Sequence, residues 1–218
     1  MITLFGAPGA GKTEQGKLLA QKHGWEWVSY RDLLMGLRDK DIIFALEHGL
    51  FVDDDKATKL MQETLNRLKT TTKPRFLSDI RGKRTREVIL DGFPADYKQV
   101  KWLIDSGEIK NLKGAIILRV PRGELWRRLV VRKRVDDTLA AIERRQDMYE
   151  RNITGMIKTL TKNGVLVREV DGGNSPQDVL ERIEDVLSDW EMVPKKQYAK
   201  ISETSRKTVN YMQPINNM

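Results

Sequence analysis

The 218-residue chain contains no cysteine, which excludes disulfides and any thiolate-bound structural zinc. It also lacks an apolar run long enough to span a bilayer, so we expect no membrane association. The first predicted strand begins at residue 2 and leaves no room for a secretory signal peptide, which makes the cytoplasm the expected location. Hydrophobic residues make up 39% and charged residues 32%, a balance typical of one α/β domain.

The net charge of +8 raises the question of nucleic acid, because a basic face is the electrostatic footprint of phosphate binding. An enzyme that binds nucleotides also needs basic residues, but there they are concentrated at one site. Here the cations concentrate between Arg119 and Arg134, at Arg122, Arg127, Arg128, Arg132 and Lys133. This local cluster favours small-molecule nucleotides as partners, and nucleic acid remains the alternative.

The most informative stretch is GAPGAGKT, residues 6–13, which completes the phosphate-loop pattern G-x-x-x-x-G-K-[ST] directly after an apolar run. Its glycines let backbone N–H groups turn inward around a polyphosphate, Lys12 reaches the β- and γ-phosphates, and Thr13 offers its hydroxyl to Mg²⁺. The helical pattern that follows points its N-terminal dipole at the anion. The predicted triphosphate site comprises Gly6, Ala7, Pro8, Gly9, Ala10, Gly11, Lys12, Thr13 and Glu14.

Five apolar segments are predicted as strands, and each precedes a helical pattern: residues 2–5, 26–29, 87–91, 114–119 and 165–170. Two of them are apolar throughout, as expected of parallel strands covered on both faces. Helices are predicted over 14–22, 31–48, 54–69, 97–106, 123–131, 138–162 and 176–190. The order predicts an α/β fold with a doubly wound, five-stranded parallel sheet over residues 1–190, followed by a polar, basic tail, 191–218.

Residues 88–91 (VILD) form an apolar strand that ends in a carboxylate, an arrangement that places an acid beside the Mg²⁺ of a phosphate loop. The continuation Asp91-Gly92-Phe93-Pro94, with Gln99 following, resembles the D-G-F-P-R-x-x-x-Q segment of adenylate kinases. The phosphate loop resembles theirs as well. The resemblance implies that Asp91 holds Mg²⁺ through water.

A third element extends this resemblance. Arg128 and Arg132 lie four residues apart on one helix face, and RVDD (134–137), Arg145 and Tyr149 follow at the spacing of the family's lid and post-lid segment. The resemblance implies a P-loop nucleoside monophosphate kinase fold with a small helical acceptor-binding insertion at about 30–86. Only Lys133 separates Arg132 from Arg134, so the lid, about 132–137, is minimal and has no zinc-type flap.

The implied reaction is transfer of the terminal phosphoryl of ATP to a nucleoside monophosphate, with Mg²⁺ bound to the ATP. Lys12 contacts the β- and γ-phosphates, and Arg128 lies against the donor base. The expected contacts of the transferred phosphoryl are Arg132, Arg134 and Arg145, with Asp136 and Asp137 pairing with these arginines as the lid closes. The loop around Gly173, after the last strand, meets the donor adenine.

The acceptor side departs from the family. Residues 28–35 (VSYRDLLM) align with I-S-T-G-D-x-L-R, so Met35 stands where the family has an arginine for the acceptor phosphate, and Ala95 replaces the second such arginine. The segment 49–52 and Gln99 still resemble the family's contacts to the acceptor base, and Gln99 favours a purine, AMP or a relative; the implied acceptor-binding positions include the departures. They are Tyr30, Met35, Phe51, Val52, Gly92 and Gln99.

The two arginines that form a clamp on the acceptor phosphate in the family are missing here, and two explanations stay open. Arg31, Arg38 or the basic segment 75–86, which contains Arg75, Arg81, Lys83, Arg84 and Arg86, could rebuild it, or this segment is a solvated loop. If nothing replaces the clamp, the chain is a degenerate relative that binds or hydrolyses ATP as a regulator. In either case we expect a monomer.

Overall fold

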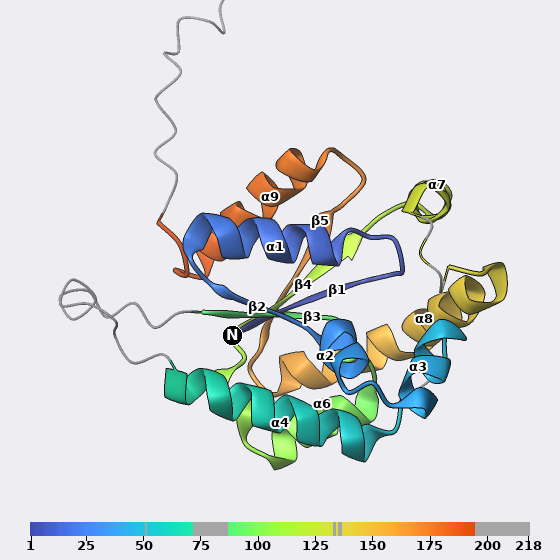
Figure 1. The fold of residues 1–218 in the computed structure, drawn as a ribbon. Coiled ribbons are helices and arrows are strands. Elements are labelled where there is room, and N and C mark those ends of the chain that lie inside the picture. The colour runs from blue at the N-terminus through green and yellow to red at the C-terminus, as the bar shows by residue number, and fades with distance from the viewer. Residues whose placement is uncertain (51, 72–86, 133, 135–136, 195–218) are drawn as a thin grey trace, which may run out of the picture. The chain divides into compact units, whose positions relative to one another are not determined.

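The computed structural model describes residues 1–50, 52–71, 87–132, 134 and 137–194 (Figure 1). The chain divides into two compact units, Met1–Ile183 and Glu184–Met218. The first unit contains the sheet and every candidate site residue that the structure describes. The second contains the last residues of the final helix and the turn that follows it, and the rest of the expected tail, 195–218, lies outside the described residues. The domain boundary expected at residue 190 stays a prediction.

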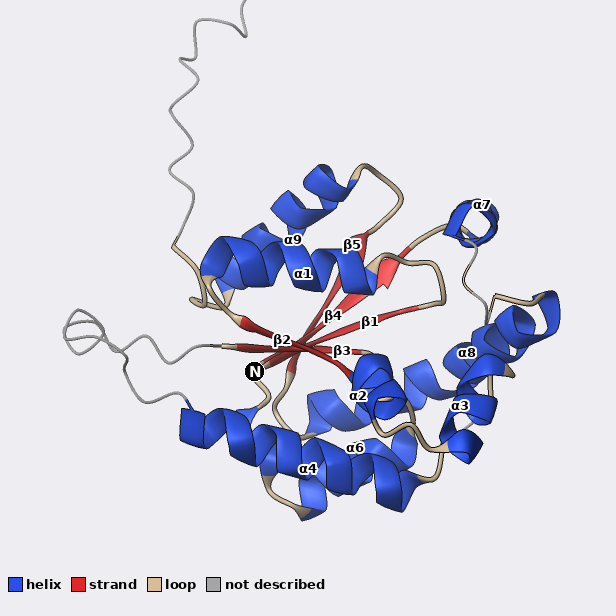
Figure 2. Ribbon diagram, in the orientation of Figure 1, coloured by secondary structure: helices blue, strands red, loops and turns tan. Residues whose placement is uncertain are grey.

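The sheet of the first unit has five strands, all parallel, as the sequence predicts (Figure 2). In chain order they are β1 (Ile2–Gly6), β2 (Glu26–Ser29), β3 (Val88–Asp91), β4 (Gly114–Arg119) and β5 (Leu166–Asp171). Their spatial order is β2-β3-β1-β4-β5, with β1 in the centre. Every residue of β1 and β3 is buried, because helices cover both faces of the sheet centre.

The strand register brings the predicted chemistry to one edge of the sheet. Asp91, the last residue of β3, lies opposite Leu4 in β1 and opposite Ser29, the last residue of β2. The phosphate loop leaves the end of β1 at the same edge. Parallel strands therefore place the loop and the carboxylate side by side, where ligands of open α/β sheets bind.

Helices flank the sheet on both sides, with α1 over one face and α4, α6 and α8 over the other (Figures 1 and 2). The bounds are α1 (Lys12–His23), α2 (Tyr30–Gly36), α3 (Lys40–Glu47), α4 (Asp54–Thr71), α6 (Tyr97–Asp105), α7 (Arg122–Arg132), α8 (Leu139–Lys162) and α9 (Pro176–Asp189). A 3₁₀ turn, Glu108–Asn111, was not expected from the sequence. Within the described residues, no helix combines the length and apolarity needed to cross a membrane.

The prediction of one helix over 31–48 is wrong, because the chain breaks there into α2 and α3. Arg38 adopts a left-handed backbone conformation, φ 53°, which ends the first helix. Asp39 then begins the second, since its side chain accepts hydrogen bonds from the N–H groups of Asp41 (2.9 Å) and Ile42 (3.3 Å). The break turns α3 toward α8.

The main core fills the space between the sheet and α2, α4, α6 and α8. Leu34, Met61, Leu90, Phe93 and Leu103 are all fully buried in it. Phe93 stands two residues after Asp91, so the segment that positions the carboxylate is anchored by a core side chain. The acceptor-side residue Tyr30 packs edge-on against Phe93, with ring centroids 5.4 Å apart.

Candidate active site

The phosphate loop has the glycine geometry that its sequence predicts. Gly9 and Gly11 have φ values of 86° and 95°, a region that only glycine enters without strain. A Cβ at Gly9 would also lie 3.0 Å from the carbonyl oxygen of Leu125 on α7. The loop is thus packed closely against α7, and a larger residue at Gly9 would need that helix to shift. At Gly11 a Cβ would meet nothing closer than 3.9 Å, so the positive φ alone opposes a larger residue there.

Lys12 begins α1 and folds its side chain back over the loop. Its Nζ donates hydrogen bonds to the carbonyl oxygens of Gly6 (2.6 Å) and Ala7 (3.2 Å). Burial lowers the pKa of Lys12 to about 8, with Asp91 opposing the shift and neighbouring arginines adding to it. The ammonium group therefore lies above the place where a polyphosphate would meet the loop.

Thr13 and Asp91 meet directly, since the threonine hydroxyl donates to Asp91 Oδ2 at 2.7 Å. Among the described residues, no group of three or more His, Asp or Glu side chains could hold a metal ion by itself. Mg²⁺ is commonly held by one carboxylate, a hydroxyl and the substrate's phosphates, with several waters kept. The Thr13 hydroxyl on α1 and the Asp91 carboxylate at the end of β3 fit that requirement, because both offer oxygen ligands.

An arginine cluster converges on Asp137. Arg132, the last residue of α7, donates from Nε (2.9 Å) and Nη2 (2.6 Å) to the two carboxylate oxygens, and Arg145 on α8 donates to Oδ1 at 3.1 Å. The Asp137 side chain is only 3% exposed. Burial acts to raise its pKa, but the hydrogen bonds and charges of Arg132 and Arg145 outweigh burial and lower the pKa below its ordinary value.

The backbone ties Arg134 into the same cluster. Its N–H donates to Asp137 Oδ2 at 3.3 Å, and its carbonyl accepts from the Asp137 N–H at 2.9 Å. Asp136, the other predicted acid of this segment, lies outside the described residues together with Lys133 and Val135. Its pairing with the arginines stays a prediction.

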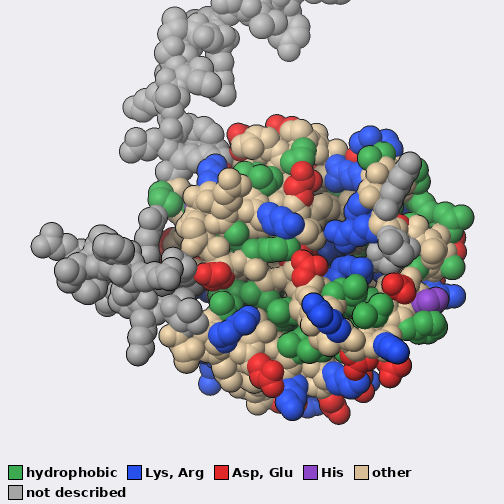
Figure 3. All heavy atoms as spheres, viewed as in Figure 1, with side chains coloured by type: hydrophobic (Ala, Val, Ile, Leu, Met, Phe, Trp, Pro, Cys, Tyr) green, Lys and Arg blue, Asp and Glu red, His purple; other side chains and the backbone are tan. Residues whose placement is uncertain are grey.

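A cleft of about 1670 Å³ joins these elements. Figure 3 shows Lys and Arg side chains gathered on the part of this face that lies toward α7 and α8. The predicted site residues that line the cleft are Pro8, Gly9, Ala10, Gly11, Lys12, Thr13, Glu14, Tyr30, Met35, Asp91, Gly92, Arg128, Arg132, Arg134, Arg145 and Gly173. The cleft therefore connects the phosphate loop with the start of α2, where the acceptor is expected.

Gln99, the predicted purine contact, lies in the protein interior and is 2% exposed. Its amide nitrogen donates to the Tyr30 hydroxyl (3.0 Å), and its amide oxygen accepts from the Ala95 N–H (2.8 Å). Each end of the amide thus has one partner and keeps a second N–H or lone pair, so it is the burial of Gln99 that separates it from a base in the cleft. The assignment of Gln99 to the acceptor base stays a prediction.

The other residues predicted to bind the acceptor fall into three groups: some line the cleft, one packs against the core, and some lie outside the described residues. Val52 packs against the main core, and Phe51 lies outside the described residues. Met35 and Arg31 line the cleft one helical turn apart on α2, whereas Arg38 is exposed beyond the helix end. The alternative basic segment, 75–86, lies outside the described residues.

Sequence reasoning missed several residues that line the cleft. Gln15, Asp32, Glu47 and Glu124 all do so. Gln15 directly follows Glu14, the last residue of the predicted triphosphate site, and Glu124 stands four residues before Arg128, so sequence spacing could have indicated both. Asn174, in the loop expected to meet the donor adenine, also lines the cleft, and its carbonyl accepts a hydrogen bond from Arg128, 46 residues away.

An all-parallel sheet with a phosphate loop after its central strand, and arginines from two helices beside that loop, defines a P-loop kinase. A family model described as an AAA domain matches residues 2–150. Curated adenylate kinases align along most of the chain. That of Thermus thermophilus is 30% identical over 201 residues, covering 85% of this chain and 96% of the relative. That of Azobacteroides pseudotrichonymphae is 32% identical, covering 84% and 94%.

The adenylate kinase of Micrococcus luteus is 28% identical, covering 84% of this chain and 87% of the relative. The chain belongs to the adenylate kinase family. The family resemblance and the fold predicted from the sequence are therefore confirmed, and with them the broad assignment as an ATP-binding nucleotide kinase.

Proposed function

We propose that the chain transfers the terminal phosphoryl group of Mg²⁺-bound ATP to a purine nucleoside monophosphate, AMP or a close relative. The observation that carries the proposal is the position of the arginine cluster. Arg132, Arg134 and Arg145 line the same cleft as Lys12, between the phosphate loop and α2. Phosphoryl transfer needs positive charge around the moving group and alignment of donor and acceptor oxygens, and little covalent chemistry from the protein.

Each donor-side residue has a distinct task in this proposal. The loop N–H groups and Lys12 bind the β- and γ-phosphates, for which Lys12 exchanges its hydrogen bonds to Gly6 and Ala7 for phosphate oxygens. Thr13 and Asp91 would hold Mg²⁺, with Asp91 acting through water. When bound, the ion neutralises phosphate charge and orients the triphosphate.

The arginines would act chiefly in the transition state. Asp137 holds Arg132 and Arg145 close together, which two cations would otherwise resist. Their guanidinium groups are then placed to meet charge that develops on the transferred phosphoryl oxygens without a large rearrangement. Asp136 is proposed to assist in the same way.

For the acceptor phosphate we propose Arg31 as the replacement for the family's arginine at Met35. Among the described residues of α2 and α3, Arg31 is the cation that lines the cleft, beside the carboxylates of Asp32 and Glu47. It is partly buried and lies four residues before Met35 on the same helix, so the two side chains share a face. A phosphate near Met35 would lie within its reach.

The test of the proposed function is a panel of nucleoside monophosphates assayed with Mg²⁺-ATP. We expect AMP to be phosphorylated by the wild type, and Lys12→Ala to abolish transfer and weaken ATP binding, because it removes a charge-assisted phosphate contact and leaves the loop backbone intact. Equal ATP affinity in wild type and variant would contradict the assignment of this loop as the donor site.

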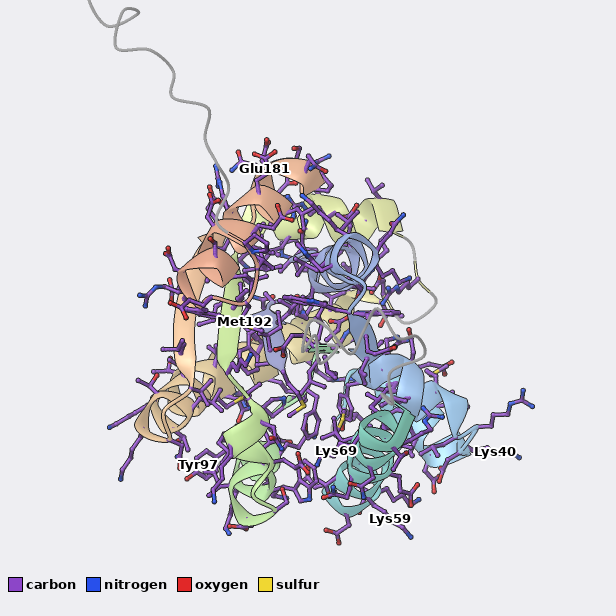
Figure 4. All side chains as sticks on the ribbon, turned by 90° about the vertical axis from the view of Figure 1, so that its left-hand side faces the viewer. Lys40, Lys59, Lys69, Tyr97, Glu181 and Met192 are labelled. Carbon is purple, nitrogen blue, oxygen red and sulfur yellow. The ribbon has the colours of Figure 1, made fainter. Side chains whose placement is uncertain are left out.

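The Arg31 assignment has its own test. Arg31→Ala should raise KM for the acceptor by about tenfold or more, since a charge-assisted bond to phosphate is lost, with little change in ATP affinity. Lys40→Ala is the matched control, because its side chain extends from α3 into solvent (Figure 4). If Met35→Arg with Ala95→Arg restores acceptor binding while Arg31→Ala has no effect, Arg31 is not the clamp.

A second candidate function is supported by the buried amide of Gln99 and by the loss of both acceptor arginines. In that case the chain binds or hydrolyses ATP as a regulator and has no efficient monophosphate acceptor. The monophosphate panel separates the two functions, because the regulator would release inorganic phosphate at a rate that no monophosphate changes.

A further inference from the structure

Glu124, in the first turn of α7, lines the cleft, although the sequence did not lead us to assign it to the site. Its carboxylate is shared by two arginines of the same helix. Arg127 binds it through Nε (2.7 Å) and Nη2 (2.8 Å), and Arg128 binds Oε1 through Nε at 2.7 Å. The two arginines differ in environment, since the Arg128 side chain is 24% exposed and that of Arg127 is 69% exposed.

Arg128 extends from α7 across the donor side of the cleft. Its Nη2 lies 3.4 Å from the carbonyl oxygen of Asn174, to which it donates, and its Nη1 would lie 3.9 Å from a Cβ placed on Gly11. The guanidinium group is therefore situated between the phosphate loop and the loop that follows β5. A planar cation at this place can lie against the base of a nucleotide whose phosphates occupy the phosphate loop.

Arg128 thus bridges α7 and the loop of residues 172–176, and hydrogen bonds hold this loop in place. The Gly172 N–H donates to the Arg119 carbonyl (2.7 Å), and the Gly173 N–H donates to Asp171 Oδ1 (2.9 Å). From α1, the side chain of Gln15 donates to the Pro176 carbonyl at 2.9 Å. Arg128 therefore connects two segments that are held in place. The position of its guanidinium group depends on which residue of α7 binds it.

We propose that Glu124 is a positioning residue that holds Arg128 in place over the donor base. The proposal rests on the proposed function, in which ATP is the donor. A free arginine side chain has many rotamers and must lose that freedom when a base binds, whereas one anchored at Nε has already lost part of it. The two arginines hold the pKa of Glu124 at about 2, so its carboxylate stays charged near neutral pH.

The sign of a mutational effect distinguishes positioning from simple electrostatics. Glu124 is an anion that lines a cleft built to bind an anionic ligand. If the charge of Glu124 acted only through the electrostatic field in the cleft, neutralising it would make the cleft more attractive to ATP and tighten binding. If it positions Arg128, the same change weakens ATP binding.

The experiment measures binding of Mg²⁺-ATP and of Mg²⁺-tripolyphosphate, which has the phosphates and no base, to the full chain by calorimetry. Glu124→Gln should weaken ATP about fivefold, because the arginine must then be ordered on binding, and should leave tripolyphosphate unchanged or tighter. Glu124→Asp keeps the charge but shortens the side chain, and we expect it to weaken ATP as well. In an Arg128→Ala background, Glu124→Gln should have no further effect.

Asp105→Asn is the matched control, because it breaks an exposed ion pair of the same i,i+4 spacing, Lys101–Asp105 on α6, away from the cleft. It should leave both ligands unchanged. Tighter binding of both ligands to Glu124→Gln, equal weakening of both, or full additivity with Arg128→Ala would overturn the proposal. Failure of the wild type to bind ATP at all would instead overturn the proposed function.

Discussion

At the scale of single residues, the ionisation of Lys12 makes phosphate binding by the loop depend on pH. The cationic form binds phosphate, and burial lowers the pKa of Lys12 to about 8. Since deprotonation then occurs as pH rises through that value, kcat/KM for ATP should fall above about pH 8. Bound phosphates favour the cation, so kcat should decline only at higher pH.

A pH series of ATP affinity over about three pH units, roughly 6.5 to 9.5 around the pKa of Lys12, provides the measurement. Lys12→Met is the control, and its weakened affinity should not vary with the ionisation of this position. Constant wild-type affinity across the whole range would show that Lys12 remains charged throughout.

The arginines around Asp137 give a second prediction at this scale. Arg145→Ala should lower kcat by about 10²-fold or more and change ATP affinity little, because its contact with the phosphoryl group strengthens in the transition state. Arg151→Ala, at an 81% exposed position of the same helix, is the control. Unfolding of the variant, or loss of ATP affinity in proportion to rate, would assign Arg145 a structural or ground-state role.

At the scale of elements, the position of α3 depends on one glycine. Gly49, just after α3, has φ 66°, and a Cβ there would lie 2.5 Å from the carbonyl oxygen of Ala141 on α8. Arg144 strengthens the same junction by donating to the His48 carbonyl at 2.9 Å. The end of α3, beside the part of the cleft where we propose that the acceptor binds, is thereby docked on the helix that contains Arg145.

We therefore expect Gly49→Ala to destabilise the fold by about 1–3 kcal/mol, through backbone strain and the clash with α8, and to raise KM for the acceptor. Thermal unfolding and steady-state kinetics measure the two effects. Gly155→Ala is the control, since Gly155 lies within α8 with open space around it, and it should stabilise the protein by about 0.5–1 kcal/mol. Unchanged stability of Gly49→Ala would show that α3 can move away from α8.

The elements also show what the sequence could reveal. The phosphate loop, β3 with Asp91, and α7 with Arg128 and Arg132 were predictable because each rests on local spacing or an apolar run. The break between α2 and α3 was not, since Arg38 gives no sign of its left-handed conformation. The burial of Gln99 was equally hidden, because its partner Tyr30 stands 69 residues away in the chain.

At the scale of the whole first unit, the parallel sheet brings separate parts of the sequence to one cleft. The loop after β1, the end of β3, the helix after β4 and the loop after β5 all lie at the same sheet edge, where parallel strands end. Cations from α1, α2, α7 and α8 line the cleft, which accounts for part of the positive net charge without a nucleic acid partner. Salt-dependent retention on nucleic acid would argue for that alternative partner.

The most direct test of the central claim follows the fate of the terminal phosphate. ATP labelled in the γ-phosphate is incubated with the protein, Mg²⁺ and AMP, and the products are separated. We predict label in the β-phosphate of ADP formed from AMP, with none formed by Lys12→Ala. Label that stays in ATP with every monophosphate of the panel, or that appears only as inorganic phosphate at a rate independent of AMP, would contradict the claim.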